Sequence, residues 1–171
     1  YLMHFCVRWY TLITILFFVI VNIVGFFFFD SYSNTIDDVD WKAPWILLSF
    51  TTALKLFQAP FTAIITGLGK VKEMNKVLFY QQLFIPLAMW LSLFCGLKLY
   101  VLGISSLVGV LIWFIYVLKT SLIKILVNLW NSKITNRINY VQEIFPYQWK
   151  IALSWISGYF IFQLFNPVLF A

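Results

Sequence analysis

The sequence predicts an all-α, polytopic integral membrane protein with about five transmembrane helices. Hydrophobic residues make up 63% of the 171 residues and charged residues only 11%, which is not the composition of a soluble domain of this length. The apolar runs repeat at the length needed to span a bilayer. The formal charge of +6 falls as short basic segments between those runs, which indicates membrane topology and argues against a nucleic-acid partner.

The first two spans are expected at 9–29 and 43–66. The first contains no charged residue. An acidic connection at 30–40 separates the spans, and we place it outside the membrane. The second span returns inward and ends in a basic turn at 67–76 that holds Lys70, Lys72 and Lys76. Lysines concentrate in short cytoplasmic loops, so we interpret them as topology determinants that also contact anionic lipids.

Two further spans are expected at 77–97 and 99–118, and a fifth at 151–171. The connection 119–150 is long and basic, and part of it has apolar residues at helical spacing. These residues are Leu122, Ile125, Leu126, Leu129 and Trp130. The pattern predicts an amphipathic helix at the cytoplasmic headgroups.

The distribution of lysine and arginine places the amino-terminal side of the chain in the cytoplasm. Of the 12 basic residues, two fall outside on this topology, Lys42 and Lys98, and one, Lys55, lies within a span. All the others fall inside: Arg8, Lys70, Lys72, Lys76, Lys119, Lys124, Lys133, Arg137 and Lys150. The positive-inside rule therefore gives the orientation.

The second span carries a polar stripe with a lysine near its middle. The stripe consists of Thr51, Lys55, Gln58, Thr62 and Thr66. Separations of three and four residues place these side chains on one helical face. A charge at the bilayer centre costs about 2.5 to 3.5 kcal/mol on insertion scales, so such a residue is expected to face a cavity or a partner helix. We interpret Lys55 as a site for an anionic group, and a structural pairing with another helix is the alternative.

Other polar residues within the spans have a more ordinary explanation. They are Gln81, Gln82, Gln163 and Asn166. Amide side chains commonly join membrane helices by hydrogen bonds of about 0.6 kcal/mol. Lining of a cavity is the less frequent alternative, and we retain it for Gln163 and Asn166. Ser105 and Gly109 form a pair of small residues four apart, which predicts close approach of another helix.

No catalytic, cofactor or metal motif is present, so the sequence predicts neither an enzyme nor a bound cofactor. The chain has one histidine, His4, and no cluster with metal-ligand spacing. The string GLGK at 67–70 lacks the first glycine and the final Ser or Thr of a phosphate-binding loop. Every Asp and Glu falls in an expected loop or at a helix end, so no proton-coupling carboxylate is expected within a span.

Two blocks of the sequence carry a resemblance to a known family. They read FQAPFTAIITGLGKVKEMNKV and YQWKIALSWISGYFIFQLFNPVLFA, separated by two spans and the basic connection. The chain resembles the polysaccharide and O-antigen flippases of the multidrug/oligosaccharidyl-lipid/polysaccharide exporter superfamily. The resemblance implies a MATE-like transporter fold, in which two six-helix lobes are joined by a long cytoplasmic connection.

On this resemblance the chain is a fragment of a longer protein. Residues 1–118 would hold helices three to six, the last four of the amino-terminal lobe. Residues 119–150 would be the connection between lobes, and 151–171 the truncated first helix of the carboxy-terminal lobe.

The resemblance also implies a function. Members of the family move lipid-linked oligosaccharide repeat units across the bacterial inner membrane by alternating access, for polysaccharide and lipopolysaccharide assembly in the cell envelope. Their cargo has an anionic headgroup, and polymerase and assembly proteins are expected partners besides membrane lipids. Lys55 is the position onto which the cationic role of the family cavity carries over. The cavity-lining set is then Lys55, Gln58, Thr51, Thr62, Gln163 and Asn166.

Two alternatives remain open from the sequence. A drug or metabolite antiporter of the same superfamily would present intramembrane carboxylates to a cationic cargo. A membrane scaffold or enzyme subunit without transport activity would tolerate replacement of Lys55 by alanine without any change in surface polysaccharide.

Overall fold

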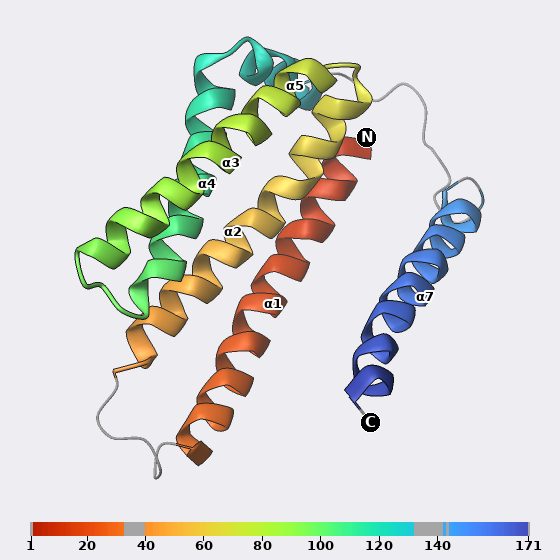
Figure 1. The fold of residues 1–171 in the computed structure, drawn as a ribbon. Coiled ribbons are helices and arrows are strands. Elements are labelled where there is room, and N and C mark those ends of the chain that lie inside the picture. Colours follow the sequence, from red (N-terminus) through yellow and green to blue (C-terminus); the bar gives the residue numbers. More distant parts are fainter. Residues whose placement is uncertain (1, 33–39, 132–141, 143, 171) are drawn as a thin grey trace. The chain divides into compact units, whose positions relative to one another are not determined.

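The computed structural model describes residues 2–32, 40–131, 142 and 144–170 (Figure 1). Every regular element within these ranges is an α-helix, which confirms the predicted all-α class for the described part of the chain. The helices are α1 (Leu2–Tyr32), α2 (Lys42–Gly67), α3 (Val71–Phe94), α4 (Tyr100–Lys119), α5 (Leu122–Asn131) and α7 (Phe145–Phe170). Helices α1 to α5 form one compact unit, and α7 belongs to a second unit that is described by itself.

Four of the helices are long and apolar enough to cross a membrane. The segments that meet this criterion are Met3–Asp30 in α1 and the whole of α2, α3 and α4. The shortest of them, α4, has 20 residues and is therefore about 30 Å long, the thickness of a hydrocarbon core. These helices indicate a membrane-embedded protein.

Residues 151–170 of the fifth expected span fall within α7, which is not among the four helices of the described residues that are long and apolar enough to cross a membrane. This helix has 26 residues and begins at Phe145, six residues before the expected start. Residues 132–141 and 143 of the expected connection, and residue 171, lie outside the described residues.

The first two helices are antiparallel neighbours in Figure 1. Their contacts pair later residues of α1 with earlier residues of α2. Ser49 Oγ donates a hydrogen bond to Asn22 Oδ1 at 3.2 Å. Gly25 lies directly against the indole ring of Trp45, where any larger side chain would overlap the ring. The missing Cβ therefore lets the aromatic ring of one helix seat against the backbone of the other.

Helices α3 and α4 form a hairpin with a short turn. The preceding α2–α3 turn contains Gly69 at φ +79°, and the α3–α4 turn contains Gly96 at φ +72°. Glycine adopts this left-handed backbone without steric cost, which ends the helices at these points. Helix α3 begins at Val71, six residues before the expected span, so Lys72 and Lys76 belong to the helix and not to the turn.

The apolar core of the first unit lies at the end of the bundle where α5 packs. It contains residues from all five helices: Met3, Ile65, Met74, Val77, Trp113, Val117, Leu122 and Leu126. Leu122 and Leu126 anchor α5 while Lys124, Val127, Asn128 and Trp130 remain exposed. Helix α5 falls within the segment where the sequence predicts an amphipathic helix.

Candidate functional site

Lys55 stands at the midpoint of α2, as the fourteenth of its 26 residues. Its side chain is exposed, and its Nζ donates a hydrogen bond to Ser106 Oγ of α4 at 3.4 Å. Within the described residues no carboxylate lies in ion-pair range of this ammonium group. The described part of the chain thus leaves the charge of Lys55 without a counter-charge.

The next two residues of the stripe join α2 to α4. Gln58 is only 5% exposed, and its Nε2 donates to the carbonyl oxygen of Val110 at 3.2 Å. Thr62 Oγ1 accepts a hydrogen bond from Trp113 Nε1 at 3.0 Å and donates to the carbonyl oxygen of Gln58 at 3.2 Å. Gln58 Nε2, Thr62 Oγ1 and Trp113 Nε1 thus each have a partner on one of the two helices, as buried polar groups require.

The three contacts keep a nearly constant sequence separation. Lys55 and Ser106 are 51 residues apart, Gln58 and Val110 are 52 apart, and Thr62 and Trp113 are 51 apart. A separation that varies by only one residue means that α2 and α4 run parallel and that nearly equal numbers of turns separate the contacts on each helix. The polar stripe of α2 therefore faces α4 along three successive contacts.

The two outer threonines of the stripe bond within their own helix. Thr51 is fully buried, and its hydroxyl donates to the carbonyl oxygen of Leu48 at 2.9 Å. Thr66 is exposed, and its hydroxyl donates to the carbonyl oxygen of Thr62 at 2.8 Å. This back-bonding satisfies a hydroxyl inside a helix without a second helix.

The two remaining candidate residues, Gln163 and Asn166, belong to α7. Gln163 is exposed on α7, and the side chain of Asn166 lies outside the described residues. Because α7 belongs to the separate unit, the cavity-lining role of both residues stays a prediction from the sequence.

The amide groups of α3 differ in role. Gln81 Nε2 donates to the carbonyl oxygen of Gly109 in α4 at 2.7 Å, whereas Gln82 is exposed. A Cβ at Gly109 would lie 2.7 Å from the side chain of Ile85, so this glycine allows α3 to approach closely. Gln81 thus makes the interhelical amide bond expected of such residues.

Sequence reasoning missed the residues on the facing helix. Ser106, Val110 and Trp113 are spaced by four and three residues, close to the spacing of Lys55, Gln58 and Thr62. Val110 contacts Gln58 through its backbone carbonyl, so its side chain gives no polar signal for this pairing in the sequence.

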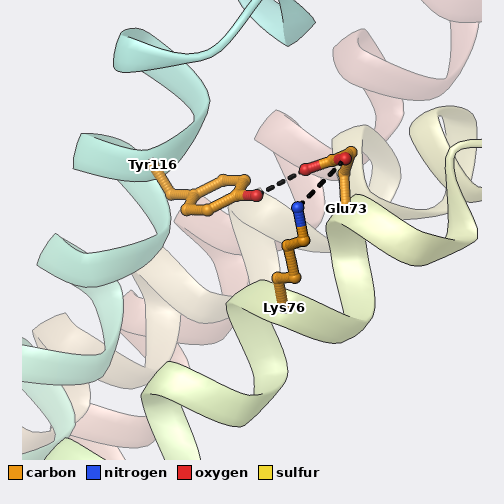
Figure 2. Close-up of polar contacts among 3 residues, drawn as sticks. All are labelled: Glu73, Lys76 and Tyr116. Carbon is orange, nitrogen blue, oxygen red and sulfur yellow. Dashed lines mark hydrogen bonds and ion pairs between the residues drawn. The ribbon is translucent and has the colours of Figure 1, made fainter.

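A charged cluster at one end of the hairpin was also missed. Glu73, expected in a turn, lies in the first turn of α3. Tyr116 of α4 donates a hydrogen bond to Glu73 Oε2 at 2.5 Å, and Lys76 Nζ lies 3.5 Å from Glu73 Oε1 (Figure 2). Both oxygens of this carboxylate are therefore occupied, one by a neighbouring helix and one by its own helix.

The described residues contain no group of three or more His, Cys, Asp or Glu that could hold a metal ion. Comparisons with protein-family models, with curated proteins and with solved structures found no match to this chain.

Proposed function

We propose that this chain is part of a membrane transporter, a flippase that moves lipid-linked oligosaccharide or polysaccharide repeat units across the bacterial inner membrane by alternating access. The proposal rests on the position of Lys55 and on its positive charge, which is unpaired within the described residues. It stands at the midpoint of a membrane-length helix, its side chain is exposed, and no carboxylate of the described residues pairs with it.

The physical argument concerns the cost of that charge. An ammonium group near the bilayer centre costs about 2.5 to 3.5 kcal/mol unless water or an anion meets it. Ser106 is a neutral partner, so it orients the ammonium group without cancelling the charge. An anionic headgroup, such as the phosphate groups of a lipid-linked sugar, is the complementary ligand.

The surroundings of Lys55 suit a rigid binding position. Gln58 and Thr62, one and two turns away on the same face, are hydrogen-bonded to α4. Positions on packed helices hold a charged group more steadily than positions on loops. In this proposal Gln58 and Thr62 fix the helix pair that presents the ammonium group to the cargo.

A cationic cargo fits less well. It would need a carboxylate that is available within a span, and Glu73 of α3 is occupied by Tyr116 and Lys76. The charge presented near the middle of α2 is positive. The proposal therefore names an anionic cargo rather than a cationic drug.

The test is complementation of surface polysaccharide in cells that lack the protein. Lys55→Arg should retain much of the activity because it keeps the charge, and Lys55→Glu should abolish it. Lys98→Glu is the matched control, since this exposed lysine lies in the α3–α4 turn. Membrane fractions should contain equal amounts of all variants.

Two results would contradict the proposal. Equal activity of Lys55→Arg and Lys55→Glu would remove the cationic site. Unchanged polysaccharide in Lys55→Ala would favour a scaffold role without transport.

A further inference from the structure

An open hollow of about 510 Å³ lies along the beginning of α3. Its lining is formed by Lys72, Asn75, Lys76, Phe79 and Tyr80. All five side chains are exposed, and their spacing of three and one residues places them on one face over about two turns. The hollow is separate from the Lys55 site, because none of its residues belongs to α2.

The hollow carries an excess of positive charge. Lys76 shares Glu73 with Tyr116 of α4 (Figure 2). Lys72 and the amide of Asn75 make no hydrogen bond or ion pair with any other described residue. Two ammonium groups and one amide thus converge on a space in which one carboxylate, already bonded twice, is the nearest negative charge.

The polarity of this face changes in one direction along α3. Lys72 and Lys76 are followed on the same face by Phe79, Leu83 and Leu87, at separations of three or four residues. The aromatic ring and both leucines are exposed. Over about 22 Å the face therefore passes from cationic to aromatic to aliphatic.

A glycerophospholipid has the same order of polarity along its length. Its anionic phosphate lies at the headgroup level, its glycerol at the interface and its acyl chains in the hydrocarbon. Lysines at a membrane surface attract anionic lipids, and aromatic residues favour the interface. Helix α3 is apolar and long enough to span the membrane, so its basic end and this hollow would meet the headgroup layer.

We propose that this face of α3 binds one anionic glycerophospholipid. Lys72 and Lys76 contact the phosphate, and Asn75 donates a hydrogen bond to it. Phe79 and Tyr80 pack against the glycerol region. One acyl chain follows Leu83 and Leu87, which fixes the lipid lengthwise on the helix. This site is independent of the proposed transport cargo.

The test is lipid binding to the purified protein in detergent, followed by native mass spectrometry. Phosphatidylglycerol should bind at least tenfold more tightly than phosphatidylcholine with the same acyl chains. The double variant Lys72→Gln/Lys76→Gln should bind phosphatidylglycerol at least tenfold more weakly. Lys70→Gln removes one positive charge outside the hollow, so it is the control for the single variant Lys72→Gln and should bind phosphatidylglycerol less than twofold more weakly.

Three results would overturn the proposal. Equal losses in Lys70→Gln and Lys72→Gln would mean diffuse surface charge without a defined site. Equal binding of the two lipids would remove the role of the headgroup. Displacement of phosphatidylglycerol by an equal concentration of inorganic phosphate would mean an anion site that does not use the acyl chain.

The acyl-chain contact has its own variant. Leu83→Asn should weaken the binding of phosphatidylglycerol about threefold or more and leave the binding of soluble glycerophosphate unchanged. Unchanged binding of both ligands in this variant would contradict the lengthwise arrangement. Because Lys72 makes no bond in the described structure, the single variant Lys72→Gln retains the fold and provides the same readout if the double variant is unstable.

Discussion

The indole nitrogen of Trp113 donates a hydrogen bond to the hydroxyl of Thr62 at 3.0 Å. This bond joins α4 to α2 at a tryptophan that is only 6% exposed. One turn away, the side chain of Gln58 makes another hydrogen bond between the same helices. The pairing of α2 with α4 thus depends on polar contacts as well as on packing, as is common between membrane helices.

A double-mutant cycle should measure the Thr62–Trp113 bond. We expect Thr62→Val and Trp113→Phe each to destabilise the protein, and the double variant to lose less than the sum. Hydrogen bonds between membrane helices average about 0.6 kcal/mol, so we expect a coupling energy of about 0.5 to 1 kcal/mol. Denaturation in mixed micelles, followed by helical circular dichroism, provides the measurement. Strict additivity would contradict the bond. Trp90→Phe, at an exposed position, is the control for Trp113→Phe.

Two substitutions of Gln58 should distinguish a role of this residue in packing from a role in transport. Gln58→Leu keeps most of the side-chain volume and removes the buried amide, so we expect a stability change below about 1 kcal/mol. Gln58→Ala leaves a void and should cost about 2 to 3 kcal/mol. Similar losses in the two variants would contradict this account of the site.

Transport by the same variants then tests the cavity. If Gln58 only joins α2 to α4, Gln58→Leu should keep nearly full polysaccharide complementation. A stable but inactive Gln58→Leu would show that the amide also acts on the cargo.

Helix lengths could be predicted closely where apolar runs define them. The expected span 43–66 differs from α2 by one residue at each end, and 99–118 differs from α4 by one residue at each end. The start of α3 could not be predicted in this way. Its first turns contain Lys72, Glu73 and Lys76, which favour a helix locally although they interrupt the apolar pattern.

The residues that α2 contributes to the candidate site could be predicted, whereas those of α4 could not. Spacing alone places Lys55, Gln58 and Thr62 on one face of α2, and all three contact α4. What lies opposite depends on which spans become neighbours, and periodicity within one helix carries no such information. Ser106 and Trp113 were missed for this reason.

Tyr116→Phe should weaken the α3–α4 hairpin. The substitution removes the donor to Glu73 and leaves the ring in place, so the unfolding midpoint should fall. Glu73→Gln keeps an acceptor for the phenol and should have the smaller effect. Thermal unfolding of the purified protein provides the measurement. Tyr10→Phe is the control because the Tyr10 hydroxyl makes no hydrogen bond to another described residue. An equal fall of the unfolding midpoint in Tyr116→Phe and Tyr10→Phe would contradict the role of the bond.

Gly25→Ala should destabilise the α1–α2 pair. The added Cβ would overlap the indole ring of Trp45, and that ring is already packed against Phe29 with ring centroids 5.1 Å apart. Overpacking of this kind costs about 1 to 3 kcal/mol. Gly67→Ala is the matched control, since nothing lies within 4 Å of its added Cβ; alanine there should be neutral or stabilising by up to about 1 kcal/mol. Denaturation in mixed micelles should separate the two variants, and equal stability of both would contradict the close approach of α1 and α2 at Gly25.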